Sequence, residues 1–264
     1  MAETKDVKAN GITIRCRIDG PADAPWLVFS NSLATDLTMW DPQADHISRS
    51  HRVLRYDQRG HGQTEAPAGR YSFATLLADA LALMDALDIE RAHFCGLSMG
   101  GATAMGLAQQ APARLDKAIV CDSPCASTPA SHQQWEERIA VAQRDGMAAL
   151  VEPTVVRWFP PETVAANPPH LTHIRKMIAA TPVNGFVGCA AALGDHDYRS
   201  AVATVTRPVL FVAGEKDGTT PAAMRQMQGE LAGSRYAEMP GAGHISNLDQ
   251  PDLFNRVLDD FLRG

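Results

Sequence analysis

The stretch that decides the fold is Ala92-His-Phe-Cys-Gly-Leu-Ser98-Met-Gly-Gly101. It begins with an apolar run typical of a buried strand and ends where a segment rich in Gly and Ala takes up helical spacing. Between the two lies the pattern G-x-S-x-G, in which a sharp turn from strand to helix exposes the serine hydroxyl. Side chains at Gly96 and Gly100 would collide with the neighbouring backbone, so glycine is needed at both. The stretch predicts that Ser98 is a nucleophile, and the alternative is a Gly-rich turn with an idle serine.

Outward from this turn, short apolar runs alternate with amphipathic segments of helical period. Such alternation predicts an α/β fold with a mostly parallel central sheet and helices on both faces. We expect strands at 11–18, 26–30, 52–56, 92–95, 117–121, 209–213 and 235–238, and helices at 73–87, 99–110, 222–231 and 252–262.

The alternation stops between residues 123 and 206, where helical pieces are separated by prolines. We expect a helical lid insertion at 123–206 in a core made of 1–122 and 207–264. An insertion after a central strand would cover the carboxyl ends of the strands, where α/β sheets bind ligands.

Composition limits the class of protein. The chain has 264 residues, 45% of them hydrophobic, which suits one large core. Its net charge of -6 and lack of Lys/Arg runs argue against a nucleic-acid partner and favour a small molecule. There is no signal peptide pattern and no apolar run long enough for a membrane span, so we expect a cytoplasmic protein with no membrane partner. Five scattered cysteines indicate reduced thiols, and no pattern points to an oligomeric state.

A serine hydroxyl needs an adjacent base, and that base needs an orienting carboxylate. After a G-x-S-x-G turn the expected chain order is serine, acid, histidine. Asp217 follows the apolar run 209–213, and His244 precedes the last helix. We therefore predict Asp217 as acid and His244 as base. Asp122 also ends an apolar strand and stays open as an alternative acid.

The oxyanion formed by attack on a carbonyl needs at least two positioned donors. The amide of Met99 comes with the turn, and we expect the second to be the amide of Leu33, in the loop after strand 26–30. In loop 57–62 we expect Asp57 and Arg59 to fix neighbouring loops rather than to touch the substrate.

With these motifs in place, nearly the whole chain resembles the 3-oxoadipate enol-lactonases, a family of α/β-hydrolases. The resemblance is carried by Asn31-Ser-Leu-Ala-Thr-Asp36, Met39-Trp-Asp41, Arg52-Val-Leu-Arg-Tyr-Asp57, Arg59-Gly-His-Gly62, the residues 90–101, Trp135-Glu-Glu-Arg-Ile139, Asp145-Gly-Met-Ala-Ala149, Arg157-Trp-Phe159 and the residues 240–247.

The resemblance implies the α/β-hydrolase fold and the opening of 3-oxoadipate enol-lactone to 3-oxoadipate in the β-ketoadipate pathway of aromatic catabolism. It implies a Ser-His-Asp acyl-enzyme mechanism with no metal and no organic cofactor. The substrate carries a carboxylate, and Trp135 and Arg138, three apart in the lid, would share a helix face and bind it. The alternative is a solvated arginine beside a packed tryptophan.

Two segments depart from the family pattern, and both lie beside the expected site. The chain has Ala102-Thr-Ala-Met105 where the family has bulkier residues and a Trp, and Asp122-Ser-Pro-Cys125 where it has Asn-Thr-Ala-Ala. They leave two other functions open. One is a related carboxylesterase or amide hydrolase acting on another small carboxylic acid derivative, and the other is a non-catalytic ligand receptor on the same fold.

Overall fold

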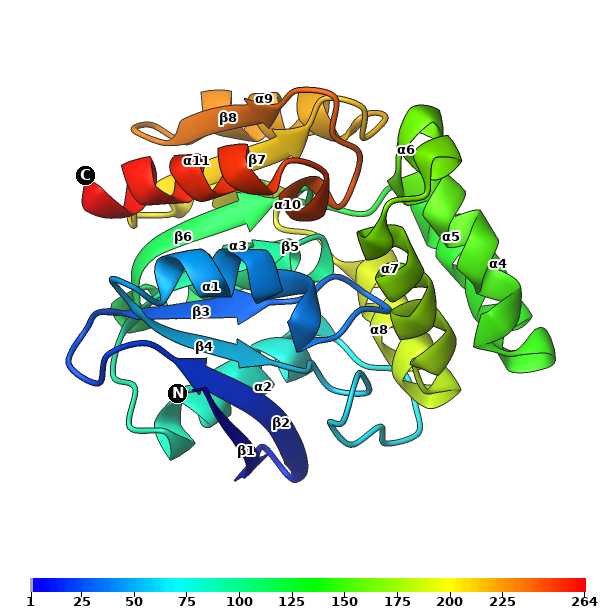
Figure 1. Ribbon diagram of the computed structural model, residues 1–264, viewed down its shortest axis with the longest axis horizontal. Helices are drawn as coiled ribbons and strands as arrows, with labels where there is room; N and C mark the ends of the chain where they lie inside the picture. Colours follow the sequence, from blue (N-terminus) through cyan, green and yellow to red (C-terminus); the bar gives the residue numbers. More distant parts are fainter. Residues whose placement is uncertain (1) are drawn as a thin grey trace.

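An eight-stranded sheet runs through the protein in the computed structural model, which describes residues 2–264 (Figure 1). The strand order is β1-β2-β4-β3-β5-β6-β7-β8. The first two pairs, β1 with β2 and β2 with β4, are antiparallel, and all later pairs are parallel. The strands are β1 (Glu3–Ala9), β2 (Ile12–Asp19), β3 (Trp26–Ser30), β4 (Arg52–Tyr56), β5 (Ala92–Leu97), β6 (Leu115–Cys121), β7 (Val209–Gly214) and β8 (Arg235–Met239).

The strand order fixes where a ligand can bind. β3 pairs with β4 on one side and with β5 on the other. The chain crosses from β3 to β4 in one direction and then from β4 past β3 to β5 in the opposite direction. In open α/β sheets such a reversal opens a crevice at the carboxyl ends of the strands. The loops that follow β3 and β5 meet at this crevice, and they contain Leu33 and Ser98.

Helices cover both faces of the sheet (Figure 1). The helix α1 (Asp41–Ile47) packs with α11 (Pro251–Arg263) on one face, and α2 (Phe73–Ala86) packs with α3 (Met99–Gln110) on the other. The helix α9 (Thr220–Glu230) packs on β7 and β8. Every residue of β5 and β7 is buried, as expected for parallel strands with helices on both sides. Shorter helices are η1 (Leu37–Trp40), η2 (Pro112–Arg114) and α10 (Ser246–Asp249).

The expected helical insertion is present between β6 and β7 and lies across the carboxyl ends of the strands (Figure 1). It contains α4 (Pro129–Asp145), η3 (Met147–Leu150), α5 (Val151–Trp158), α6 (Pro161–Ala166), α7 (Pro169–Ala180), α8 (Val183–Asp195) and η4 (Arg199–Thr204). Several of its prolines occupy the first helical turn, where the missing N–H costs no hydrogen bond. Within residues 2–264 no single helix could span a membrane; α7 and α8 reach the necessary length together only across a 99° bend.

The strand β1 is missing from the sequence-based prediction. It is an edge strand whose residues are mostly exposed or half-buried, so it lacks the apolar run that marks the central strands. It pairs with β2 through a turn at Asn10 and Gly11, both of which have positive φ. An Asn-Gly pair between alternating residues is a hairpin signal, and it could have identified this strand.

The lid packs closely on the core where Gly185 of α8 meets Gly60. A Cβ atom built on Gly185 in α8 would lie 1.9 Å from the carbonyl oxygen of Gly60, so there is no room for a side chain. Gly229 in α9 has no atom within 4 Å of such a Cβ.

Replacing Gly185 by Ala should therefore lower the free energy of unfolding by about 1–3 kcal/mol, because overpacking forces backbone to move. The matched change Gly229→Ala should raise it by up to about 1 kcal/mol through helix propensity. Urea denaturation of both variants measures the difference. Equal stability of the two variants would show that α8 does not pack on the loop at Gly60.

Candidate active site

Ser98 lies in a strained turn between β5 and α3. Its φ is +57° and its ψ is -111°, a region that L-residues rarely adopt and that costs about 1–3 kcal/mol. The Ser98 amide donates to the Cys121 carbonyl at 2.8 Å, and the Gly100 amide donates to the Asn31 carbonyl at 3.0 Å. A Cβ on Gly100 would lie 2.1 Å from the Ser30 carbonyl oxygen, which explains the second glycine of the motif.

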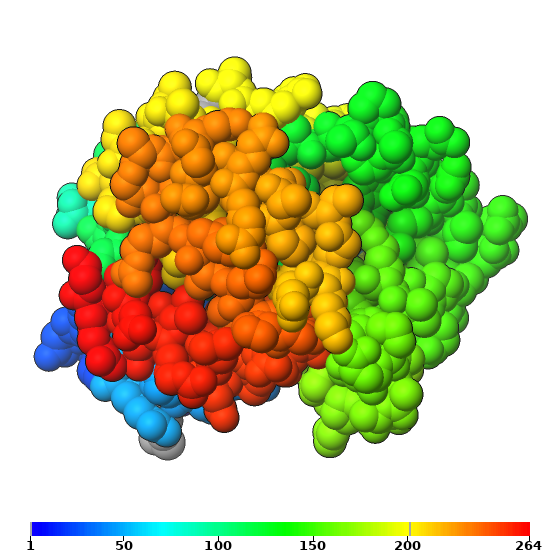
Figure 2. Space-filling view, turned by 90° about the horizontal axis from the view of Figure 1, so that it is seen from above, coloured from blue at the N-terminus to red at the C-terminus, as the bar shows by residue number. Residues whose placement is uncertain are grey.

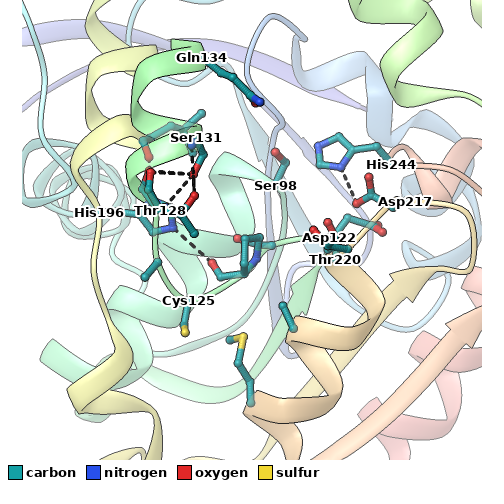
Figure 3. A pocket seen from close by; sticks show the side chains of 18 of the residues that line it. Ser98, Asp122, Cys125, Thr128, Ser131, Gln134, His196, Asp217, Thr220 and His244 are labelled. Carbon is teal, nitrogen blue, oxygen red and sulfur yellow. Dashed lines mark hydrogen bonds and ion pairs between the residues drawn. The ribbon is translucent and has the colours of Figure 1, made fainter. Parts of the chain in front are cut away.

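Asp217 and His244 meet beside this serine. Asp217 follows β7, His244 follows β8, and the Asp217 Oδ2 lies 2.8 Å from the His244 Nδ1. A ring nitrogen facing a carboxylate carries the proton, so Nε2 is left as an acceptor. In Figure 3 the imidazole lies between Ser98 and Asp217. Burial alone would raise the pKa of Asp217, but His244 holds that pKa below its ordinary value.

The lid takes part in holding His244. The His244 amide donates to the Trp158 carbonyl at 2.7 Å, and the two rings stack with centroids 5.8 Å apart. Trp158 is the last residue of α5, so the backbone and the ring of His244 are both positioned by the insertion.

Asp122, the alternative acid, has other partners. It is fully buried, its Oδ1 accepts from the Gly214 amide at 2.7 Å, and its Oδ2 accepts from the Ser246 hydroxyl. Burial, reinforced by the charge of Asp217, raises its pKa well above the ordinary value. In the described part of the chain it has no hydrogen bond to His244. The carboxylate that orients the imidazole here is Asp217.

The amides of Leu33 and Met99 have no hydrogen-bond partner among residues 2–264. Their neighbours are engaged: the Gly100 amide donates to Asn31, and the Ala34 amide donates to the His61 Nε2 at 2.9 Å. Buried amides are normally paired, so two free donors beside a nucleophile are what an oxyanion site requires. Leu33 also lines the cavity at Ser98.

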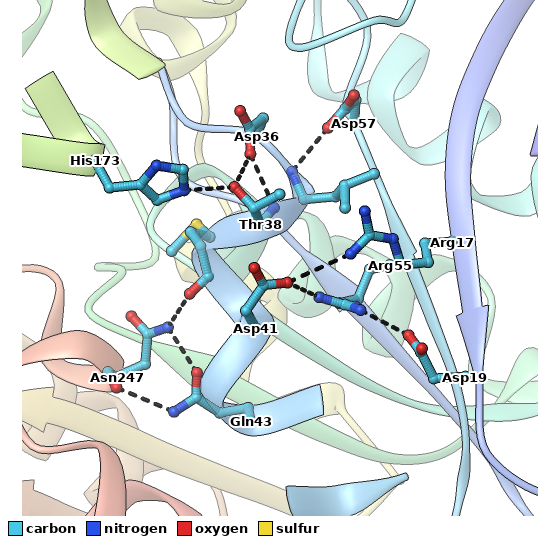
Figure 4. A network of polar contacts seen from close by, with 12 residues as sticks. Arg17, Asp19, Asp36, Thr38, Asp41, Gln43, Arg55, Asp57, His173 and Asn247 are labelled. Carbon is cyan, nitrogen blue, oxygen red and sulfur yellow. Dashed lines mark hydrogen bonds and ion pairs between the residues drawn. The ribbon is translucent and has the colours of Figure 1, made fainter. Parts of the chain in front are cut away.

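Loop 57–62 is architectural, as predicted for Asp57 and Arg59. The Asp57 carboxylate accepts from the Leu37 and Gln63 amides at 2.7 and 2.8 Å, and Arg59 forms a buried ion pair with Asp79. Figure 4 shows Asp57 beside η1, with Thr38 of η1 bonded to His173 of the lid at 2.7 Å. Sequence reasoning missed the role of His61 in holding the loop that contains Leu33.

A cavity of about 710 Å³ opens over Ser98 between the core and the lid. Of the two residues expected to bind the substrate carboxylate, Trp135 lines this cavity and Arg138 does not. The Arg138 Nη2 donates to the Thr154 hydroxyl at 2.6 Å, and burial lowers the pKa of this arginine to about 10. Arg138 and Arg157 each lie 5.5 Å from the Trp135 ring, but only Arg157 lines the cavity.

Sequence reasoning did not name Arg157 as a candidate site residue, although it lies in the quoted segment Arg157-Trp158-Phe159. Spacing along a helix indicates which residues share a face, but the packing of α4 against α5 decides which arginine reaches the cavity. Among residues 2–264 no three His, Cys, Asp or Glu side chains group as ligands for a metal ion.

Comparisons with known proteins agree with this geometry. The α/β-hydrolase fold family matches residues 25–251. The chain belongs to the α/β-hydrolase family. Within it, the chain is 35% identical over 254 residues to 3-oxoadipate enol-lactonase 1 of Acinetobacter baylyi, covering 96% of this chain and 94% of the relative.

Two further proteins define its neighbourhood. The crystal structure of the enol-lactonase from Burkholderia xenovorans LB400 superimposes with a TM-score of 0.95 at 39% identity, covering 98% of this α/β-hydrolase and all of that chain. RutD of Pseudomonas savastanoi pv. phaseolicola, whose name assigns it to carbamate hydrolysis, is 30% identical over 248 residues, or 92% of this chain and 95% of RutD. The predicted resemblance to the enol-lactonases is confirmed, and the similarity to RutD leaves the substrate to be argued separately.

The buried imidazole of His61 gives a testable link between pH and stability. Burial lowers its pKa to about 4, below the value of about 6.5 in an unfolded chain. The neutral ring is the form that accepts from Ala34, so its contribution is complete above pH 6.5 and is lost as the pH falls toward 4. We expect wild-type protein to lose on the order of 3 kcal/mol of unfolding free energy from this group over that range.

Urea denaturation at pH 7 and pH 4 should show a smaller loss in His61→Gln, which has no titrating ring at this position. Burial also lowers the pKa of His93 to about 4, but His93 is present in both proteins. The difference between their two losses of unfolding free energy therefore reports on His61. An equal loss in both proteins would mean that His61 is not held neutral.

Proposed function

We propose that this α/β-hydrolase is a serine hydrolase that opens 3-oxoadipate enol-lactone. The observation that carries the proposal is the 2.8 Å contact between His244 Nδ1 and Asp217 Oδ2 beside Ser98, at a cavity that Leu33, with its free amide, also lines. The similarity to enol-lactonases over nearly the full chain supports the choice of substrate.

Each group has a step that its geometry favours. Ser98 Oγ attacks the ring carbonyl while His244 Nε2 takes the hydroxyl proton, and the oxyanion accepts from the amides of Leu33 and Met99. When the ring C–O bond breaks, His244 returns the proton to the enol oxygen, and an acyl-enzyme remains on Ser98. His244 then takes a proton from water, which attacks the acyl carbonyl, and returns it to Ser98 Oγ as the ester bond to the serine breaks. The released enol tautomerises to 3-oxoadipate.

Arg157 suits the carboxylate of this substrate. The carboxylate is attached to the enol half of the lactone, which leaves on the side of His244. Arg157 lies on that side, because its charge lowers the pKa of Asp217 and the next residue, Trp158, stacks on His244. In the described residues Arg157 has a ring contact with Trp135 but no ion pair, so its guanidinium is available to an anion.

Purified protein should turn over the enol-lactone with kcat/KM far above that for small amides and carbamates. Asp217→Asn should lower kcat by roughly 10⁴, as in other Ser-His-Asp enzymes, because a neutral amide does not stabilise the imidazolium and its NH2 group can hold the ring in the wrong tautomer. Asp122→Asn is the matched control, since an amide oxygen can still accept from Gly214, and we expect less than about a tenfold loss. Steady-state kinetics measures all three proteins.

A larger loss of kcat in Asp122→Asn than in Asp217→Asn would assign the acid to Asp122. A preference for carbamates or amides by orders of magnitude would favour the second candidate, an amide-type hydrolase, which the similarity to RutD supports. Labelling of Ser98 by a fluorophosphonate without turnover of any carbonyl substrate would favour a ligand receptor.

Replacing Arg157 by Ala should raise KM for the anionic lactone about tenfold or more and leave phenyl acetate within about twofold, since an ion pair made equally in ground and transition states acts on binding. Arg138→Ala is the comparison, and we expect its effect on KM to be smaller because its guanidinium faces Thr154. A larger effect at Arg138 would return the carboxylate contact to that residue.

A further inference from the structure

The cavity extends well beyond the space around Ser98 and His244. Past Ser98 it continues between the segment after β6 and one face of α9, and we call this part the distal groove. Its lining includes Pro124, Cys125, Thr128, Ala223, Met227 and Glu230.

One face of α9 forms a continuous wall of the groove. Thr220, Ala223, Met227 and Glu230 all line the cavity, and their spacings of three or four residues put them on a single helix face. From the first to the last, this face is about 15 Å long. The wall therefore leads from the neighbourhood of Asp217 to the exposed side chain of Glu230.

An apolar strip of the groove is formed by Cys125 and Ala223, which are half-buried, and by Met227, which is buried. Polar side chains flank this strip: Ser131 and His196 are half-buried, and Glu230 is exposed. This arrangement suits an uncharged hydrocarbon chain that enters from solvent.

The side of Ser98 on which the distal groove lies, relative to His244, decides which half of a substrate binds in it. The leaving oxygen of an ester must take its proton from His244, so the alcohol or enol half lies on that side of Ser98. Figure 3 places Thr128, Cys125 and His196 on the opposite side of Ser98 from His244. The groove therefore faces the acyl half.

The enol-lactone does not need this space. Its carboxylate belongs to the enol half, on the side of Arg157, and its acyl half is a short piece of the ring. A cavity of 710 Å³ is within the range of about 300–1,000 Å³ that holds drug-sized ligands.

We propose that the distal groove is an acyl-chain subsite, and that the protein also hydrolyses neutral esters and lactones with an unbranched medium-length acyl chain. This inference rests on the proposed serine hydrolase chemistry at Ser98.

Two isomeric esters test the proposal directly. Ethyl hexanoate carries its chain on the acyl side and hexyl acetate carries it on the alcohol side, and the two have the same composition. We expect kcat/KM for ethyl hexanoate to exceed that for hexyl acetate at least about tenfold, because its methylenes are buried in the groove. Ala223→Trp should bring the ratio close to one by filling the groove.

The matched control is Ala222→Trp, which places the same side chain at an exposed neighbouring position that does not line the cavity. It should keep the wild-type ratio. If Ala223→Trp fails to fold, as judged by fluorophosphonate labelling of Ser98, Gln226→Trp fills the groove from an exposed position and should lower the ratio in the same way.

A wild-type ratio near or below one, or an equal fall of the ratio in Ala222→Trp and Ala223→Trp, would overturn the subsite. Turnover of the enol-lactone is measured in parallel. If the enol-lactone is hydrolysed while neither ester is, the acyl-chain subsite fails alone; if no carbonyl substrate is hydrolysed, the proposed chemistry fails as well.

Discussion

The backbone turn at Ser98 constrains everything around it. The turn is so close to the neighbouring chain that the Gly100 position has no room for a Cβ, and Ser98 itself must adopt a positive φ. Such strain persists only where surrounding contacts fix the backbone. Here the contacts come from the two adjacent strands. The Ser98 amide donates to the Cys121 carbonyl at the end of β6, and the Gly100 amide donates to the Asn31 carbonyl just after β3. The same contacts bring the loop of Leu33 to the nucleophile, so one steric constraint places both the serine and an oxyanion donor.

The imidazole depends on a second set of contacts that joins the core to the lid. Asp217 fixes the ring from the core side, while Trp158 holds its backbone amide and covers its face from the insertion. The tryptophan also excludes water from one side of the ring, which strengthens the contact with Asp217. A lid that served only to cover the cavity would not need these contacts. The insertion is therefore part of the site as well as its cover.

Sequence reasoning succeeded where the constraint is local. The turn at Ser98 could be read from two glycines and a serine, and the positions of Asp217 and His244 followed from the strands before them. It failed where the outcome depends on packing. The edge strand β1 has no apolar run because one side faces solvent, and the choice between Arg138 and Arg157 depends on how two lid helices meet. The partner of His61 lies 27 positions away in the chain, and no spacing rule predicts it.

The two halves of the cavity differ in the charge of the side chains that line them. Near His244, the carboxylate of Asp217 needs a compensating cation, and Arg157 supplies positive charge while leaving its guanidinium free for a substrate anion. On the far side of Ser98, the strip of Cys125, Ala223 and Met227 carries no charge, and Arg199, another cavity residue, is paired with Asp197. An uncharged chain can therefore lie against Cys125 and Met227 without desolvating an ion. A substrate with an anionic leaving half and a neutral acyl half would fit both regions at once, and under the proposed function this difference in polarity, more than the volume of the cavity, would set the orientation in which esters bind.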